Sequence, residues 1–198
     1  MRQLALGISP PPQPTLDNFV PGANTELLLR LKEFQAGTFP ESVLYLWGEA
    51  GSGKTHLLRA CGGTDVVDDV EKLDEASQIG LFNAINEKRQ SGGTVLAAGN
   101  APPAQLNLRE DLKSRLAWGL VYQVKPLTDE ERAVYLRGEA ERRSMRVPDE
   151  VIRYLLTHLR RDLPSLTAIL DVLDRASLEQ HRQITLPLVK EVLKDAAV

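Results

Sequence analysis

Residues 48–55 read Gly48-Glu49-Ala50-Gly51-Ser52-Gly53-Lys54-Thr55, which fits the spacing G-x-x-x-x-G-K-[ST] at every fixed position. An apolar run that ends at Trp47 precedes this stretch, and a run typical of a helix follows it. The glycines allow backbone N–H groups to turn inward around phosphate oxygens, while Lys54 supplies a cation and Thr55 a hydroxyl for Mg²⁺. The sequence therefore predicts a phosphate-binding loop between a buried strand and a helix N-terminus, and with it a bound nucleotide. The residues of this region expected to bind nucleotide are Gly48, Ala50, Gly51, Ser52, Gly53, Lys54, Thr55 and His56.

The composition is that of an ordinary globular chain, with 42% hydrophobic and 26% charged residues among 198. This length suits one domain with a small appendage. The single cysteine, Cys61, cannot form an internal disulfide, which favours a reducing, cytoplasmic location, and we interpret it as a packing residue. No apolar run approaches the ~18 residues of a membrane span. The net charge of −3 argues against broad nonspecific binding to nucleic acid.

Three zones differ in composition along the chain. Residues 1–14 combine a short apolar stretch with a proline-rich run, which predicts an extended spacer. Residues 15–125 alternate apolar runs with helical periodicity, as an α/β domain does, and residues 126–198 show helical patterns alone. Asn24 is the expected N-cap of the first helix, and Gly37 its end. The expected strands are 43–47, 65–68, 94–98 and 120–124, and the expected helices include 25–36, 129–144, 149–159, 163–181 and 186–195.

Acidic and polar side chains follow two of these strands. Asp68 and Asp69 end the second expected strand, and Asn100 follows the third. Because ligands gather at the carboxyl ends of parallel strands, we expect all three near the phosphate loop. Asp68, together with Thr55, would hold Mg²⁺ through its water shell. Asp69 would act as general base and Asn100 would lie near the γ-phosphate; the alternatives are an acidic turn and an ordinary turn asparagine.

Together with the helical C-terminal zone, these motifs resemble an AAA+ ATPase. Residues 16–24 read Leu-Asp-Asn-Phe-Val-Pro-Gly-Ala-Asn and resemble the segment that opens the ATPase domain of the bacterial initiator DnaA, where it lies along the adenine. Residues 112–120 read Leu-Lys-Ser-Arg-Leu-Ala-Trp-Gly-Leu and resemble the SR-x-x-WG box of DnaA, whose arginine is an arginine finger. The resemblance gives Arg115 that role, and the local alternative is an ion pair with Asp111. The resemblance also adds four nucleotide-binding residues, Leu16, Phe19, Val20 and Asn24.

The resemblance covers the chain from residue 15 but not the DNA-binding domain with which DnaA continues. This arrangement resembles the Hda family of DnaA-related regulatory inactivators. Residues 3–8, Gln-Leu-Ala-Leu-Gly-Ile, are similar to the peptide that binds the bacterial sliding clamp, the β subunit of DNA polymerase III. In an extended peptide, apolar pockets would take the aliphatic side chains and the glutamine would hydrogen-bond at the rim. The expected clamp-binding residues are Gln3, Leu4, Leu6 and Ile8.

Two features depart from the family. Only 14 positions separate Lys54 from Asp68, where the family inserts a helix, a strand and another helix. Because the family's strand order is 5-1-4-3-2, the missing strand is an edge strand, and we expect a trimmed, four-stranded parallel sheet flanked by helices. Pro164 stands where the family has its sensor 2 arginine, with Arg160 or Arg161 as substitutes. The ATPase activity expected of the chain itself is therefore weak at most.

The resemblance implies a regulator of replication initiation. Bound to ADP or ATP with Mg²⁺ and tethered to the DNA-loaded clamp, it would present Arg115 in trans to ATP-bound DnaA. Hydrolysis by DnaA would then prevent re-initiation. The regulator would lie at the nucleoid through the clamp, without sequence-specific DNA binding or a membrane contact, and as a possible homo-oligomer. Two alternatives stay open: an autonomous oligomeric AAA+ ATPase or helicase-loader-like protein, and a small-molecule P-loop kinase.

Overall fold

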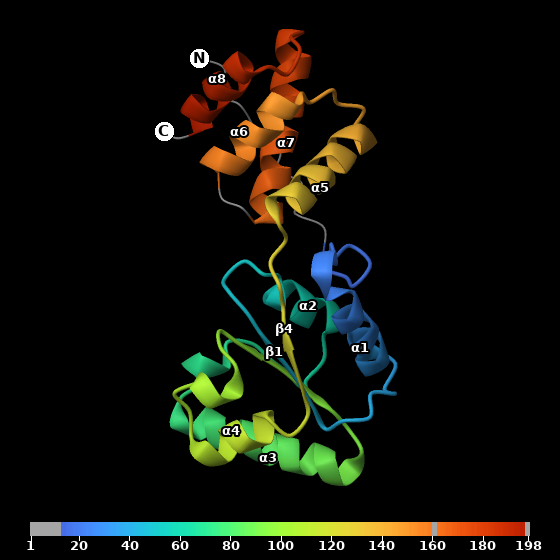
Figure 1. Ribbon diagram of the computed structural model, residues 1–198, viewed down its shortest axis with the longest axis vertical. Coiled ribbons are helices and arrows are strands. Elements are labelled where there is room, and N and C mark those ends of the chain that lie inside the picture. Colours follow the sequence, from blue (N-terminus) through green and yellow to red (C-terminus); the bar gives the residue numbers. More distant parts are fainter. Residues whose placement is uncertain (1–12, 160–161, 197–198) are drawn as a thin grey trace.

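The computed structural model describes residues 13–159 and 162–196 (Figure 1). A parallel sheet of four strands carries helices on both faces, and a bundle of further helices lies at one end of it. The strands are β1 (Val43–Trp47), β2 (Val66–Val67), β3 (Val95–Gly99) and β4 (Leu120–Gln123). The helices around the sheet are α1 (Thr25–Gln35), α2 (Lys54–Cys61), α3 (Glu75–Ser91) and α4 (Glu110–Leu116). The bundle consists of α5 (Asp129–Arg142), α6 (Asp149–His158), α7 (Leu163–Gln180) and α8 (Leu186–Ala196). The expected clamp-binding residues Gln3, Leu4, Leu6 and Ile8 lie outside the described residues, as do Arg160 and Arg161.

The strands of the sheet alternate their side chains between two cores. In β1, Leu44 and Leu46 pack with apolar residues of α1 and α2. Val43 and Tyr45 point to the other face and pack with residues of α3 and α4. All four side chains are fully buried. Successive side chains of a strand point to opposite faces of the sheet. Because helices cover both faces here, the side chains on both sides of β1 are apolar, and its sequence is a continuous apolar run.

The strand order is β2-β3-β1-β4, and every neighbouring pair is parallel. This confirms the expected sheet, in which one edge strand is missing. The register places Trp47 opposite Gly99, so the segments that follow β1 and β3 leave the sheet at the same end. The new edge strand β2 is shorter than expected. Asp65 precedes it in an ion pair with Lys88 at 2.7 Å, and a charge at this position protects the exposed edge.

The helical bundle has an apolar core of its own and begins where the capping residues indicate. Thr128 accepts a hydrogen bond from the backbone of Glu131, whose side chain accepts one in return from the backbone of Thr128. Asp162 caps α7 by accepting from the backbone N–H of Ser165 at 3.0 Å. No helix within the described ranges is long and apolar enough to cross a membrane. The buried core residues of the bundle include Leu136, Val151, Ile152, Leu155, Leu166, Leu170, Leu173, Leu188 and Val189.

Asn24 occupies the expected N-cap position of α1 but does not cap the helix with its side chain. Instead the buried amide donates to the carbonyls of Pro21 at 3.0 Å and Lys125 at 2.9 Å. Its Oδ1 accepts from the backbone N–H of Lys125 at 2.8 Å. Since a buried amide must satisfy all its polar atoms, these long-range bonds take precedence, and they fasten the start of α1 to the segment that leads into the bundle.

Candidate functional site

The loop between β1 and α2 has the backbone of a phosphate cradle. Gly53 has a φ of 100°, a left-handed conformation that favours glycine. A Cβ atom at this position would come within 2.7 Å of the Phe19 ring, so the close packing also requires glycine. Ser52 is buried, and its Oγ has no hydrogen-bond partner among the described residues. A buried hydroxyl without a partner beside free helix N–H groups is suited to a ligand oxygen.

Lys54 folds back over the same loop. Its Nζ donates to the carbonyl of Gly48 at 2.7 Å and to that of Glu49 at 3.0 Å. Both acceptors are neutral, so an anionic phosphate oxygen would attract the ammonium group more strongly than they do. Lys54, Ser52 and the N-terminus of α2 therefore fit the phosphates of a nucleotide.

The structure brings together the two residues expected to bind the metal. The hydroxyl of Thr55, at the start of α2, donates to Asp68 Oδ2 at 2.7 Å. The other oxygen of Asp68 accepts from the backbone N–H of Asp69 at 2.9 Å. Hydroxyl, carboxylate and phosphate oxygens are the ligands that Mg²⁺ prefers. The described part of the chain has no cluster of three or more His, Cys, Asp or Glu side chains for a metal, so Mg²⁺ here would depend on phosphate and water as well.

Asp69, the expected general base, has another partner. Its Oδ2 accepts from Lys72 Nζ at 2.7 Å, and this bond raises the pKa of Lys72. The backbone of Asp69 is left-handed, with a φ of 50°, as the chain leaves β2 and enters a short turn. The Asp69 carboxylate is therefore engaged by Lys72 in this structure.

Asn100 leaves β3 at the same end of the sheet as the phosphate loop leaves β1, and it is exposed. Its backbone N–H donates to Glu71 Oε2 at 3.3 Å. The hydroxyl of Tyr45 donates to the carbonyl of Ala101 at 2.8 Å, and burial raises the pKa of Tyr45. Glu71 and Tyr45 therefore hold the strand tip that carries Asn100. Sequence reasoning missed both, because neither stands at a motif position.

The segment expected to lie along the adenine packs against the start of α2. The Nε2 atom of His56 donates to the carbonyl of Thr15 at 3.0 Å. The ring of Phe19 lies 5.5 Å from that of His56, measured between centroids. Leu16 is buried and Val20 is half-buried. The segment thus adjoins the phosphate loop, whereas Asn24 is occupied by its bonds to Lys125.

Arg115, the expected arginine finger, belongs to a cluster between α3 and α4. Its Nε donates to Asn86 Oδ1 at 2.8 Å. Its Cζ lies 3.5 Å from the centroid of the Trp118 ring and 5.1 Å from that of Phe82. The local alternative, a pair with Asp111, is wrong. Sequence reasoning missed Asn86 and Phe82, although their i,i+4 spacing on a helix would have placed them side by side.

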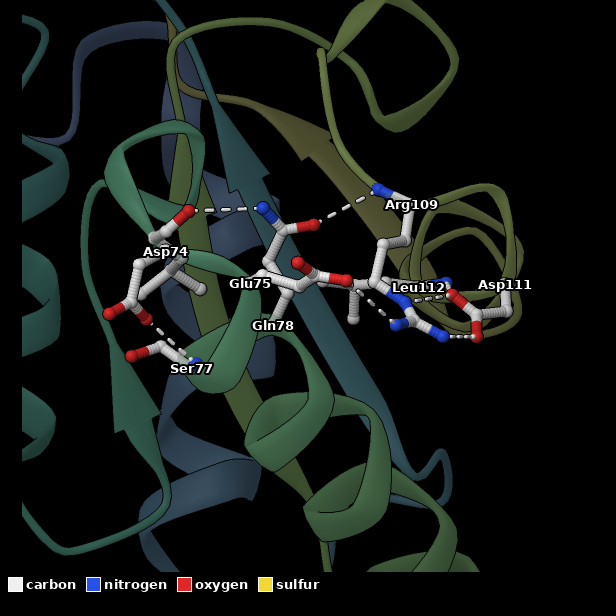
Figure 2. A network of polar contacts seen from close by, with 8 residues as sticks. Asp74, Glu75, Ser77, Gln78, Arg109, Asp111 and Leu112 are labelled. Carbon is white, nitrogen blue, oxygen red and sulfur yellow. Dashed lines mark hydrogen bonds and ion pairs between the residues drawn. The ribbon is translucent and has the colours of Figure 1, made fainter.

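The Asp111 carboxylate instead belongs to a network that joins the first turns of α3 and α4 (Figure 2). Arg109 binds Asp111 with two nitrogens, at 3.1 and 2.8 Å, which lowers the pKa of Asp111. The backbone N–H of Arg109 donates to the side chain of Gln78, and Asp74 caps α3 at Ser77. Because the two helices are tied together at this end, α4 is held in a fixed position beside α3.

The arginine cluster lies at the opposite end of the sheet from the phosphate loop. Gly119 packs so closely against the carbonyl of Val43, the first residue of β1, that no Cβ atom could fit. Arg115 is therefore near the amino end of β1, and the phosphate loop follows its carboxyl end. A strand of five residues spans about 16 Å. Arg115 and Lys54 thus do not share a site within one chain.

Known structures share this fold. Domain III of the Thermotoga maritima replication initiation protein DnaA matches with a TM-score of 0.71 and 22% identity, over 93% of this chain and 97% of that one. AMPPCP-bound DnaA from Aquifex aeolicus matches with a TM-score of 0.69 and 21% identity, over 82% of this chain and 65% of that one. The RuvB Holliday junction branch migration motor of T. maritima matches with a TM-score of 0.67 and 16% identity, over 91% and 71%. These likenesses show an AAA+ fold.

The family model of the Hda lid domain matches residues 129–193, which span the helical bundle. Residues 129–193 are therefore similar to the lid domain of Hda, and the chain as a whole shares the fold of DnaA domain III. In the Hda-like lid, the expected sensor 2 position is held by Pro164, an exposed residue in the first turn of α7. Several lid arginines are paired with carboxylates, such as Arg143 with Glu139 at 3.0 Å. Part of the basic charge of the described lid is thus neutralised within the lid itself.

Proposed function

We propose that this Hda-like protein is a nucleotide-bound regulator of replication initiation that stimulates ATP hydrolysis by DnaA. The observation that supports this most is the separation of Arg115 from the phosphate loop of its own chain. An arginine finger must reach the phosphates of a bound nucleotide, so Arg115 would serve the nucleotide of a partner. The similarity of the chain to DnaA, and of its lid to Hda, supports the ATPase domain of DnaA as that partner.

The chain's own nucleotide, ADP or ATP with Mg²⁺, would hold the base and the lid together. Lys54 and the N–H groups at the start of α2 would bind its phosphates, while Thr55 and Asp68 would hold Mg²⁺. Phe19 and its neighbours would lie beside the adenine. AMPPCP occupies the related DnaA of A. aeolicus, which supports a nucleotide in this fold.

Weak hydrolysis by the chain itself follows from the same residues. One oxygen of the Asp69 carboxylate is occupied by Lys72, so this ion pair would have to open before that oxygen could bind an attacking water. Pro164 offers no charge to a γ-phosphate. A protein that binds nucleotide firmly and hydrolyses it slowly would keep a stable surface for its partner.

The sliding clamp would raise the concentration of the regulator where DNA has just been replicated. Residues 3–8 would bind the clamp, and the proline-rich run behind them would serve as a spacer. Tethering increases the local concentration without a new contact between regulator and DnaA. The protein would then act in the bacterial cytoplasm, at the nucleoid through the clamp.

An autonomous oligomeric AAA+ ATPase is the second candidate, since the phosphate loop and the Thr55–Asp68 pair are both in place and the RuvB motor shares the fold. The deciding experiment measures phosphate release by ATP-bound DnaA with this protein and DNA-loaded clamp. A variant without residues 1–8 is the control. Stimulation that needs the clamp and the N-terminal peptide is the expected result. Turnover by this protein alone, indifferent to DnaA, would overturn the proposal.

A further inference from the structure

A second arginine lies on the ring that supports Arg115. The Cζ atom of Arg89, near the end of α3, is 4.4 Å from the centroid of the Trp118 ring, and that of Arg115 is 3.5 Å from it. Both guanidinium groups therefore contact the same indole ring, which brings two cations together at this surface.

The described residues supply no anion for this pair of cations. Arg115 has a neutral partner in Asn86, and Arg89 has no ion pair with any described residue. Elsewhere in the base, Arg30 pairs with Glu33 at 3.0 Å and Arg109 with Asp111 at 2.8 Å. Cation–π contacts with one ring offset part of the repulsion between like charges, but they do not neutralise either charge. The surface that carries Arg89 thus has unneutralised positive charge next to the finger.

The nucleotide face of an AAA+ domain has the complementary charge. In this chain that face carries Glu49, Asp68 and Asp69 around the phosphate loop, in addition to the phosphates that the loop fits. Trp118 itself is 44% exposed, as expected of an aromatic residue at the centre of a docking surface. Arg89 contacts the same indole ring as Arg115. When Arg115 reaches the phosphates of a partner, Arg89 would therefore meet the rim of the partner's nucleotide face.

From this arrangement we infer that Arg89 is a docking residue, which pairs with an acidic group on the nucleotide face of the DnaA ATPase domain. The inference rests on the proposed function and adds a separate role for Arg89. Arg115 acts on the reacting phosphate, so it sets the maximal rate of hydrolysis. Arg89 contacts the rim, so it sets the concentration at which the two proteins associate.

The test is a titration of the protein against ATP-bound DnaA with DNA-loaded clamp, in which phosphate release is followed. Arg89→Glu should raise the half-stimulating concentration about tenfold and leave the plateau rate unchanged, because a like charge then faces the acidic rim. The half-stimulating concentration of Arg89→Lys should stay within about twofold of that of the unsubstituted protein. An exposed ion pair at the rim of an interface depends on charge more than on exact geometry. The effect of Arg89→Glu should shrink as salt is added.

The matched control is Arg153→Glu, which makes the same change of charge at an exposed position of α6. It should leave both the half-stimulating concentration and the plateau unchanged. An unchanged titration with Arg89→Glu, or a fall in the plateau alone, would overturn the docking role while the proposed function stands. The docking role would also be overturned if Arg89→Glu changed only the self-association of this protein, as measured by sedimentation. Absence of stimulation by the unsubstituted protein would overturn the proposed function and the docking role together.

Discussion

The two ends of the parallel sheet differ in how their polar groups are satisfied. At the carboxyl end, Lys54 binds carbonyls of its own loop and Thr55 binds Asp68. At the amino end, Arg89 and Arg115 share the ring of Trp118, and neither pairs with a carboxylate of the described residues. One end has the groups of the proposed nucleotide site within the chain, and the other is a cationic surface for which we propose an anion of the partner. A single sheet can thus separate the binding of a nucleotide from action on another.

The largest effect expected is at the amino end. Arg115→Ala should reduce the stimulated rate of ATP hydrolysis by DnaA roughly 10³-fold, because an arginine finger acting in trans contributes at least that much. Nucleotide binding by the variant itself should not change. Lys113→Ala, which removes a lysine of the same helix that pairs with Glu110, is the control and should retain stimulation. Loss of nucleotide binding in Arg115→Ala would break the distinction between the two ends.

The carboxyl end should respond in the opposite way. Lys54→Ala should weaken ADP binding roughly 100-fold, since it removes charge-assisted hydrogen bonds to phosphate. Isothermal titration calorimetry measures the affinity, and Lys32→Ala, which removes a lysine of α1 that lies 3.9 Å from Asp17, is the control. An ADP affinity unchanged by Lys54→Ala would show that the phosphate loop is not part of the nucleotide site.

The helix that follows the phosphate loop also carries a protected thiol. Burial raises the pKa of Cys61 from 9.0 to about 11. Since the raised pKa disfavours the thiolate, reaction with a thiol reagent at about pH 8.5 should be about 100-fold slower in the native protein than in urea. As the pH rises towards 11, this protection should disappear. Equal rates in native and unfolded protein would show that the end of α2 is not packed.

The smallest effect expected is on stability, at the start of β1. Gly119→Ala should destabilise the protein by about 1–3 kcal/mol, because the added methyl group overlaps the carbonyl of Val43. Gly138→Ala, within α5, has open space around it and should stabilise the protein by about 0.5–1 kcal/mol. Urea denaturation of both variants measures the difference. An unchanged free energy of unfolding for Gly119→Ala would mean that the backbone at the amino end of the sheet shifts readily to accommodate the methyl group.

Much of the fold could be predicted, because its signals are local. The phosphate loop follows from its spacing, and the apolar run 43–47 coincides with β1. The caps at Thr128 and Asp162 mark two lid helices, whose ends differ from the prediction by one or two residues. The four-stranded order followed from the family resemblance and the short connection after Lys54, and the structure confirms it.

The rest depended on contacts between distant segments. Helix α3 was not delimited from the sequence, because only Leu81 and Ile85 are fully enclosed and its apolar periodicity is weak. Asn24 was expected to cap α1, but a backbone segment 101 residues away competes for its amide. The position of Asn86 beside Arg115 likewise follows from the packing of α3 against α4. The ion pair of Asp69 with Lys72 is local, but it forms in a turn with a left-handed Asp69 that was not expected.

The two tryptophans of the chain happen to lie at the two ends of the sheet. Trp47 is half-buried and directly precedes the phosphate loop, whereas Trp118 is 44% exposed and contacts two arginines. The intrinsic fluorescence of the protein therefore has one source beside the nucleotide and another on the surface that would meet a partner. With Trp47→Phe and Trp118→Phe variants, the occupancy of each end can be read optically, without a label.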